Sequence, residues 1–279
     1  MKVESDWPKK TVYWIEDRTL YASIPFTWEL DDVATRIQQQ SFEWDQVVIG
    51  GPAVKLVPDV FTHLNYVTIG DDYPGVLQRI NPRATRTTLG CVRDCDFCGV
   101  HQIEGDFREL ADWPDLPVLC DNNLLAASDR HFDRVMERLQ GHQNVEFSFG
   151  LDARLMTKSR AKQIAGLSLK KRGVRLALDH PSYAAKWVQA VDMLLEAGVA
   201  KRNLASFILV GFATGPVEAW ARCEFVERHG VRALPVWFHT LDAFQKNIVT
   251  VNQHHLGWTD YERRRIMQWF YQHKEAVKY

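Results

Sequence analysis

The sequence predicts an α/β protein built around a parallel sheet, and three observations lead to this fold class. From residue 84 onward, short apolar runs rich in β-branched and aromatic residues alternate with amphipathic stretches of helical period. Strands that are separated by helices pair in parallel through right-handed crossovers. Cysteines and polar residues follow directly after these strands, where ligands gather in parallel sheets. A doubly wound sheet and a partial (β/α)6 barrel both satisfy this pattern.

Six strands and four helices are predicted in this part of the chain. A Ser or Thr that accepts an N–H group marks a helix start, and a Gly marks its end. The helices therefore cover residues 128–140 from Ser128, 157–167 from Thr157, 183–197 up to Gly198 and 216–229 up to Gly230. The strands cover residues 84–90, 116–121, 145–151, 174–179, 204–212 and 231–239.

The segments on either side differ from this alternating region. Residues 1–80 predict a small α/β extension with a hairpin over 11–26, a helix over 29–40 and a buried strand that begins at 46. Residues 81–241 form the main domain. Residues 242–279 form a helical extension whose helix, 259–277, opens at Thr259. Its apolar stripe, Ile266, Trp269 and Phe270, is expected to pack on the body of the protein.

Composition limits the classes of partner. The chain has 279 residues, of which 46% are hydrophobic, so it can bury a large core. A net charge of −1 argues against a broadly basic protein but leaves a local nucleic-acid surface open. The N-terminus lacks a secretory signal, and no apolar run approaches the roughly 20 residues that span a bilayer. We therefore expect a cytoplasmic protein with no membrane partner.

Three of the five cysteines lie in one short stretch, TLGCVRDCDFCGVH, with the spacing C-x3-C-x2-C. In a reducing compartment, clustered thiols bind metal more often than they form disulfides. A zinc site needs a fourth ligand, which His101 can supply. Three thiolates alone suit a [4Fe–4S] cluster that keeps one iron open, and an open coordination position is typical of a catalytic metal. The ligands in this reading are Cys91, Cys95 and Cys98.

With an aromatic residue, Phe97, directly before the last of these cysteines, the stretch resembles the signature of the radical S-adenosylmethionine (SAM) enzymes. The resemblance covers about residues 84–240 and implies a partial (β/α)6 barrel with the cluster loop after its first strand. It also implies that SAM chelates the open iron and that one electron breaks its C–S bond. The 5′-deoxyadenosyl radical so formed abstracts hydrogen from a substrate.

The resemblance further implies which residues hold the methionine end of SAM. Asp121 and Asn122 follow the second strand, in a segment similar to the Asp-Asp-Asn variant of the branch related to cobalamin-binding enzymes. They are expected to meet the methionine amino group, although an Asx turn leaving a strand explains them too. Arg154 follows the third strand and is expected to pair with the methionine carboxylate. It is equally a candidate for a surface cap on the next helix.

The nucleoside end of SAM is assigned in the same way. Asp179 closes the fourth strand and is expected to accept the ribose hydroxyls, or else to stabilise a turn. Gly211 and Gly215 follow the fifth strand, like the family's loose Gly-x-Ile-x-Gly segment that frames adenine. A tight turn between strand and helix explains this pair of glycines equally well.

Three further residues at strand ends are candidates for the substrate side. The thiol of Cys120 can return a hydrogen atom to a substrate radical, and His180 and His239 can orient a substrate or move its proton. Trp237 and Phe238 beside His239 suggest an apolar pocket. The alternative is structural, because free cysteines are commonly buried and a histidine at a strand end often stabilises a turn.

The function predicted from the sequence is hydrogen abstraction from a small-molecule or nucleoside-like substrate, with flavodoxin or ferredoxin as electron donor. Residues 1–80 resemble a reduced remnant of the cobalamin-binding domain, without its cobalt-ligating Asp-x-His-x-x-Gly motif. The alternatives are a non-catalytic zinc or iron–sulfur protein, such as a redox sensor, and a tRNA-modifying radical SAM enzyme. The sequence leaves open the substrate, the product, the pathway, the oligomeric state and whether SAM is consumed or regenerated.

Overall fold

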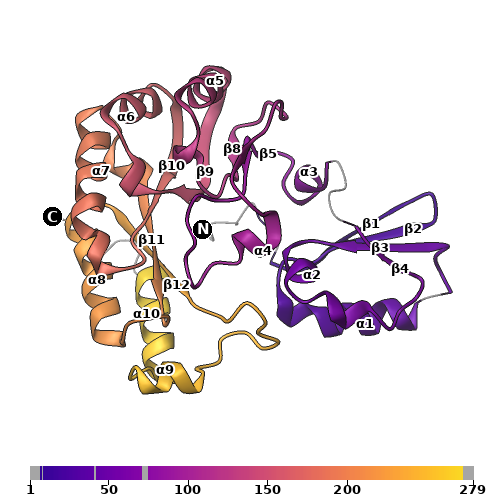
Figure 1. Ribbon diagram of the computed structural model, residues 1–279. Helices are drawn as coiled ribbons and strands as arrows, with labels where there is room; N and C mark the ends of the chain where they lie inside the picture. The colour runs from indigo at the N-terminus through magenta and orange to yellow at the C-terminus, as the bar shows by residue number, and fades with distance from the viewer. Residues whose placement is uncertain (1–6, 8, 41, 71–74, 273–279) are drawn as a thin grey trace. The chain divides into compact units, whose positions relative to one another are not determined.

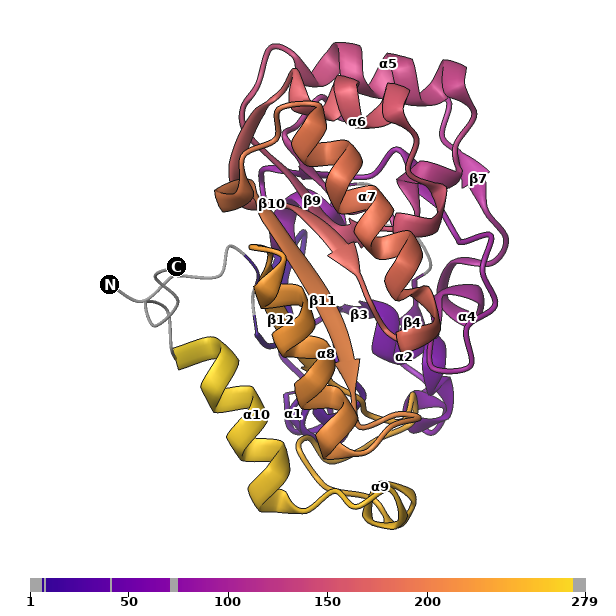
Figure 2. The same ribbon diagram turned by 90° about the vertical axis from the view of Figure 1, so that its left-hand side faces the viewer.

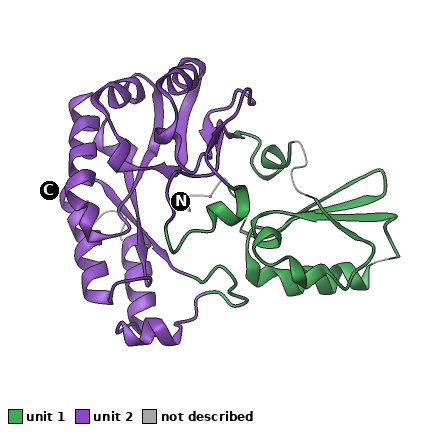
Figure 3. Ribbon diagram, viewed as in Figure 1, with its two compact units in different colours: residues 1–84, 95–105, 239–246 green, residues 85–94, 106–238, 247–279 purple. Residues whose placement is uncertain are grey.

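The computed structural model describes residues 7, 9–40, 42–70 and 75–272, and the chain divides into two compact units (Figure 3). The first unit comprises residues 1–84, 95–105 and 239–246, and the second comprises residues 85–94, 106–238 and 247–279. Each unit thus combines segments that are distant in sequence. The division predicted at residues 80 and 241 follows the chain instead, and it stays a prediction.

The first unit contains a four-stranded sheet in the order β1-β2-β3-β4. The predicted hairpin is confirmed: β1 and β2 pair antiparallel, and the turn residues Asp17 and Arg18 have positive φ angles of 45° and 63°. β2, β3 and β4 pair in parallel, and the helix predicted over 29–40 is present as α1. The elements are β1 (Val12–Glu16), β2 (Thr19–Ser23), η1 (Thr27–Glu29), α1 (Leu30–Gln39), β3 (Gln46–Gly50), α2 (Pro52–Leu56), η2 (Pro58–Phe61), β4 (Val67–Ile69), α3 (Val76–Ile80) and α4 (Val100–Glu104).

The second unit is organised around a six-stranded sheet in the order β12-β11-β10-β9-β8-β5. The pairs β8–β9, β9–β10, β10–β11 and β11–β12 are all parallel, which confirms the predicted parallel α/β class. The strands follow one another in sequence order, without the reversal that defines a doubly wound sheet. Its strands are β5 (Ala84–Thr85), β8 (Val118–Leu119), β9 (Gln143–Leu151), β10 (Ser168–Ala177), β11 (Leu204–Val210) and β12 (Arg232–Trp237).

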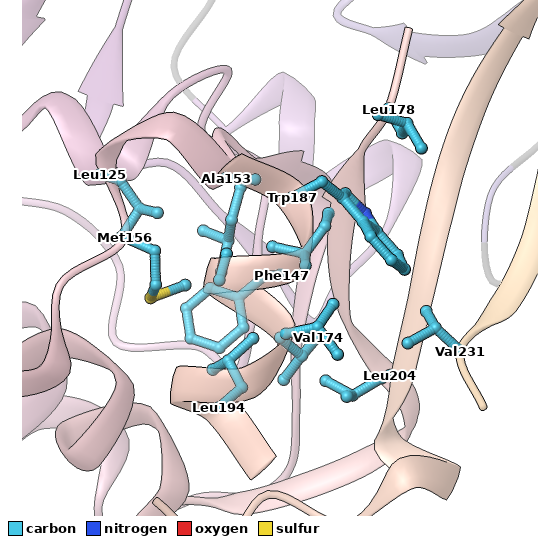
Figure 4. Packing of buried hydrophobic residues seen from close by; sticks show 14 of the residues in the cluster. Leu125, Phe147, Ala153, Met156, Val174, Leu178, Trp187, Leu194, Leu204 and Val231 are labelled. Atoms are coloured by element: carbon cyan, nitrogen blue, oxygen red, sulfur yellow. The ribbon is translucent and has the colours of Figure 1, made fainter. Parts of the chain in front are cut away.

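Helices α6, α7 and α8 lie along one face of this sheet (Figure 1), and the view turned by 90° shows them in front of the strands (Figure 2). Trp187 and Leu194 of α7 are fully buried in the core beneath them, with Phe147, Val174 and Leu204 of three successive strands (Figure 4). The remaining elements of this unit are β6 (Thr88–Leu89), β7 (Arg108–Glu109), η3 (Leu124–Ala126), α5 (Asp129–Leu139), η4 (Ala153–Leu155), α6 (Lys158–Ala165), η5 (Pro181–Tyr183), α7 (Ala184–Glu196), η6 (Lys201–Asn203), α8 (Pro216–Arg228), α9 (Val251–His255) and α10 (Asp260–Gln272).

The predicted helix starts are confirmed by their hydrogen bonds. The Ser128 hydroxyl accepts the His131 N–H at 3.3 Å before α5, and the Thr157 hydroxyl accepts the Arg160 N–H at 3.3 Å before α6. The C-terminal helix is present as α10, although residues 273–277 of the predicted span lie outside the described residues. No helix in the described part of the chain is both long and apolar enough to cross a membrane.

Two strands differ from their predicted bounds by more than two residues at one end. The strand predicted over 84–90 divides into β5, in the large sheet, and β6, which pairs antiparallel with β7. The strand predicted over 174–179 begins earlier, at Ser168. This strand, β10, pairs with β9 on both sides of a bulge. Within this bulge Arg172 has a positive φ of 58°. The first half of this strand was not predicted, because residues 170–172 are all charged and do not resemble a buried strand.

Candidate functional site

The sequence places its candidate residues after parallel strands, and the C-terminal ends of parallel strands lie together along one end of a sheet. At this end of the second unit, Asp121 follows β8 and is 4% exposed. Its Oδ1 atom accepts the backbone N–H and the hydroxyl of both Thr87 and Thr88, at 2.5–3.0 Å. These bonds fix the segment that leads to Cys91. Burial raises the pKa of the Asp121 carboxyl group, although the four hydrogen bonds act in the opposite direction.

The sulfur of Cys91 is the acceptor of two N–H groups. The backbone N–H of Arg93 lies 3.4 Å from Cys91 Sγ, and the side-chain Nδ2 of Asn123 lies 3.6 Å from it. Asn123 is 2% exposed, whereas the predicted Asn122 beside it is half-buried. Of the two asparagines, the second, Asn123, is therefore the one that contacts the Cys91 sulfur. Sequence reasoning missed Asn123 because two adjacent asparagines carry no signal that tells them apart.

Asp152, directly after β9, links the cysteine loop to Arg154. Its carboxylate accepts Arg154 Nε at 2.7 Å and Arg154 Nη2 at 3.0 Å, and it accepts Arg93 Nε at 3.0 Å. Burial acts to raise the pKa of Asp152, but the two arginines outweigh it and hold that pKa below its ordinary value. The Arg154 guanidinium also lies 4.4 Å above the Tyr183 ring. The predicted carboxylate-binding arginine thus already pairs with a carboxylate of this chain.

A shallow cavity of about 470 Å³ opens beside Arg154, within the size range of small-molecule sites. Residues that follow three different strands line it, and its lining is mostly apolar. Apart from Arg154, the residues that bear on its chemistry are Val92 of the cysteine loop, Leu125, Met156 and Arg160. The Arg160 guanidinium is engaged by the carbonyl groups of Leu125 and Ala127 and by Asp129. Both arginines that line the cavity thus pair with groups of this chain, Arg154 with Asp152 and Arg160 with Asp129.

Asp179, after β10, is half-buried, and its Oδ1 accepts the Leu209 N–H at 3.1 Å. Burial raises the pKa of the Asp179 carboxyl group. Arg222 of α8 is 4% exposed and donates to the carbonyl groups of Leu178, Asp179 and Leu209. It thereby ties the ends of β10 and β11 together. Arg222 was not among the predicted residues, because an arginine inside an amphipathic helix predicts a solvent-exposed side chain.

His180 stabilises the turn that follows Asp179. Its Nδ1 lies 3.2 Å from the Ser182 N–H and 2.8 Å from the Ser182 hydroxyl, at the start of η5. The imidazole is exposed, and its ring lies 6.0 Å from that of Tyr183. This is the arrangement of the turn-stabilising alternative, and a role toward a substrate stays a prediction.

Both predicted glycines have tight surroundings. A Cβ atom on Gly211 would lie 2.6 Å from the Trp237 ring, and its φ of +83° favours glycine independently of this contact. A Cβ atom on Gly215 would lie 2.5 Å from the Leu256 carbonyl oxygen. Close packing thus accounts for both glycines, and a part in holding adenine stays a prediction.

The five cysteines all carry free thiols and fall into two groups. Cys120 and Cys223 are fully buried, and burial raises the pKa of each thiol to about 12. Cys91 and Cys95 are half-buried, and Cys98 is exposed. The thiols of the second group are therefore more accessible to a reagent or ligand from solvent than those of Cys120 and Cys223.

The remaining candidates belong to the first unit. The Cys98 N–H donates to the Cys95 carbonyl at 2.8 Å, which forms a turn before α4, and Phe97 is half-buried. The half-buried ring of His239 lies 4.9 Å from the Trp28 ring. Trp237 is a core residue of the second unit, and the apolar pocket expected beside His239 stays a prediction.

The donor set of the cysteine loop fits an iron–sulfur cluster with bound SAM in two respects. First, the Cys91 sulfur already accepts two N–H groups, as thiolate ligands commonly do. Second, Asp121 Oδ2 and Asn123 Oδ1 are buried acceptor atoms without a hydrogen-bond partner among the described residues. An ammonium group supplies the donors that such atoms lack. Within the described ranges, no three His, Cys, Asp or Glu side chains are grouped as ligands of a metal ion.

Comparisons with known proteins add no family to this description. No protein-family model matches the chain, and no curated protein matches it.

Proposed function

We propose that the chain is a radical SAM enzyme that acts on a small-molecule or nucleoside-like substrate. The observation that carries the proposal is the cysteine loop. Its C-x3-C-x-Phe-C sequence comes after β5, the first strand of the six-stranded sheet, and after the short strand β6, and its first thiol accepts N–H groups from Arg93 and Asn123. A structural zinc site has no need of buried acceptor atoms that lack a partner among the described residues, such as Asp121 Oδ2 and Asn123 Oδ1, whereas a site that binds the amino group of SAM does.

We further propose that the six-stranded sheet is a partial (β/α)6 barrel. Two features support this closer description. The parallel strands follow one another in sequence order, and helices α6, α7 and α8 cover the same face. A sheet wound in one direction curls toward closure, with its ligands at the C-terminal strand ends. Asp121, Asp152 and Asp179 follow three such ends.

In this proposal Cys91, Cys95 and Cys98 would hold the [4Fe–4S] cluster. When bound, the cluster and SAM would supply reductive cleavage of SAM to a 5′-deoxyadenosyl radical that takes hydrogen from the substrate. Asp121 would accept the methionine ammonium through Oδ2, since its Oδ1 is occupied by Thr87 and Thr88.

Arg154 would bind the methionine carboxylate at the shallow cavity. Two N–H groups of its guanidinium donate to the Asp152 carboxylate. Asp152 would thereby keep the Arg154 guanidinium oriented toward the ligand. Asp179 would accept the ribose hydroxyls with the lone pairs that the Leu209 N–H leaves unused.

The electron would come from an external donor of the flavodoxin or ferredoxin class. We place the enzyme in the cytoplasm because three ligand thiols must stay reduced until iron is inserted. Cys120, His180 and His239 remain the proposed residues of the substrate side, and the burial of Cys120 argues for the structural role.

The deciding experiment is anaerobic reconstitution of the purified protein with iron and sulfide, followed by incubation with SAM and dithionite. We expect about four irons per chain, as in a [4Fe–4S] cluster, and release of 5′-deoxyadenosine. Single alanine variants of Cys91, Cys95 and Cys98 should lose both. Cys120→Ala and Cys223→Ala are matched controls, since they remove a thiol that is buried elsewhere, and they should retain both.

A second set of variants tests the assignment of SAM contacts. Asp121→Asn keeps an acceptor for Thr87 and Thr88 but places an NH2 group where the ammonium would bind, so SAM affinity should fall while iron content stays constant. Arg154→Gln should also weaken SAM binding without loss of iron. Stoichiometric zinc with no iron uptake would favour a non-catalytic metal protein. Deoxyadenosine release only when RNA is added would point to a tRNA-modifying enzyme.

A further inference from the structure

The buried Asn123 side chain contacts the half-buried Cys91 thiol, a pair that the family resemblance does not predict. Asn123 Nδ2 lies 3.6 Å from Cys91 Sγ, and the asparagine is 2% exposed. Its carbonyl Oδ1 atom has no partner among the described residues. The contact to sulfur is therefore the interaction that accounts for the orientation of this amide.

The backbone on both sides of this pair is fixed. Two residues before Asn123, Asp121 binds Thr87 and Thr88 through four hydrogen bonds, and these threonines lie three and four residues before Cys91. The backbone carbonyl of Asn123 accepts the Ala126 N–H at 3.0 Å, at the start of η3. Cys91 forms a β-bridge with Asp106. The amide and the sulfur are thus held close together by their own chain segments, before any ligand binds.

The chemistry of the pair depends on which amide atom faces the sulfur. An ionised sulfur has lone pairs and no proton, so it attracts an N–H group and repels a carbonyl oxygen. A hydrogen bond to an ionised acceptor is stronger than one between neutral groups, and it strengthens as negative charge on the acceptor grows. An amide held in this position stabilises the more negative of two charge states.

We propose that Asn123 is a positioning residue that raises the reduction potential of the cluster held by Cys91. The inference rests on the proposed function. In the step concerned, one electron passes from a low-potential donor to the cluster, no bond forms or breaks, and the negative charge shared by the sulfur ligands increases by one. The Asn123 N–H group stabilises this reduced form more than the oxidised form, as hydrogen bonds to sulfur do in iron–sulfur sites.

The test is a redox titration of reconstituted protein without SAM, followed by electron paramagnetic resonance of the reduced cluster. Asn123→Ala removes the donor, and Asn123→Asp replaces it with an acceptor of the same shape. We expect reduction to become about tenfold less favourable in Asn123→Ala, which is about 59 mV for one electron, and still less favourable in Asn123→Asp. Asn122→Ala is the matched control: it alters the adjacent side chain but should leave the potential unchanged.

The outcomes separate the inference from the proposed function. If the wild-type protein takes up no iron, the proposed function fails. If it takes up iron but Asn123→Ala and Asn122→Ala have the wild-type potential, the role of Asn123 is wrong and the enzyme assignment stands. An equal shift in both alanine variants also contradicts the inference, because it reflects a general change in the loop. Should Asn123→Asp fail to retain iron, Asn123→Ser supplies the second measurement, with an intermediate shift expected.

Discussion

Two aspartates at the same end of the sheet have opposite electrostatic surroundings. Burial dominates at Asp121 and raises its pKa, whereas Arg154 and Arg93 hold the pKa of Asp152 below its ordinary value. In the folded state Asp121 therefore binds a proton more readily than in the unfolded chain, and Asp152 binds one less readily. By linkage, ionised Asp152 stabilises the fold at neutral pH, while ionised Asp121 carries a burial cost there.

Asp152→Asn should lower the free energy of unfolding by about 1–3 kcal/mol at pH 7, because it leaves two partly buried arginines without their carboxylate. The contribution of Asp152 is complete above its unfolded pKa of about 3.9 and is lost as pH falls through its lower folded pKa. The difference between variant and wild type should therefore shrink below about pH 4. Urea denaturation at a series of pH values measures it.

Asp129→Asn is the control, since Asp129 pairs with Arg160 at 3.0 Å but its side chain is 89% exposed. It should change stability little at any pH. A loss in Asp152→Asn that stays constant from pH 7 to pH 3 would mean that the arginines do not set the ionisation of Asp152.

At the scale of elements, the loop between β11 and α8 shows how a glycine can have two distinct reasons to be present. Gly211 has a positive φ, and a Cβ atom there would also overlap the Trp237 ring. Gly198, which follows α7, has a φ of +104° but no atom within 4 Å of the corresponding Cβ position. An alanine at Gly198 therefore meets backbone strain alone, whereas an alanine at Gly211 meets both backbone strain and steric overlap.

Gly198→Ala should cost about 1–2 kcal/mol, the penalty of a left-handed conformation for a residue with a Cβ atom. Gly211→Ala should cost about 1–3 kcal/mol more than this, because the Trp237 ring must also move. Thermal denaturation of the two variants measures the difference. Equal losses would show that Trp237 adapts without cost, and would reopen the interpretation that Gly211 is present for a ligand.

Local signals explain which elements were predictable. Ser128 and Thr157 mark helix starts through short-range hydrogen bonds, so sequence alone places α5 and α6. The division of the 84–90 strand depends instead on Asp121, which lies more than 30 residues away and takes the N–H groups of Thr87 and Thr88. No local pattern contains that interaction.

The candidate site follows the same rule. The cysteine spacing and the strand ends are local patterns, and they led to Cys91 and to the neighbourhood of Asp121. The partners of Cys91 and Arg154 are decided by packing. Asn123 rather than Asn122 reaches the sulfur, and Asp152 occupies the guanidinium that was assigned to a ligand. Neither choice is encoded in the spacing of residues along the chain.

At the scale of the whole molecule, each unit has its own hydrophobic core. The smaller is built around α1 and β3, with Leu30, Ile37 and Ile49 fully buried. The larger includes Trp187 and Trp258, both fully buried. Separate cores of this kind allow mutational effects to be assigned to one unit, since residues without shared partners contribute to stability additively.

Helix α10 bears on self-association of the protein. β12 is the outermost strand of the large sheet, and a strand in that position can recruit a strand from another chain. Here Pro235 removes one N–H donor from β12, and α10 contacts the strand through the bond from the Tyr271 hydroxyl to the Pro235 carbonyl, at 3.1 Å. Arg232 of β12 also donates to the Phe270 carbonyl.

A chain that ends at Trp258 should therefore self-associate, because it exposes the free side of β12 together with the apolar surface that Ile266 and Phe270 normally cover. Light scattering during refolding should rise steeply with protein concentration in this truncated chain. Tyr271→Phe, which loses one hydrogen bond but keeps the helix, should scatter like the wild type. A truncated chain that stays dispersed would assign the protection to Pro235 alone. In this prediction α10 prevents self-association through β12, and its residues Ile266 and Phe270 also form part of the core.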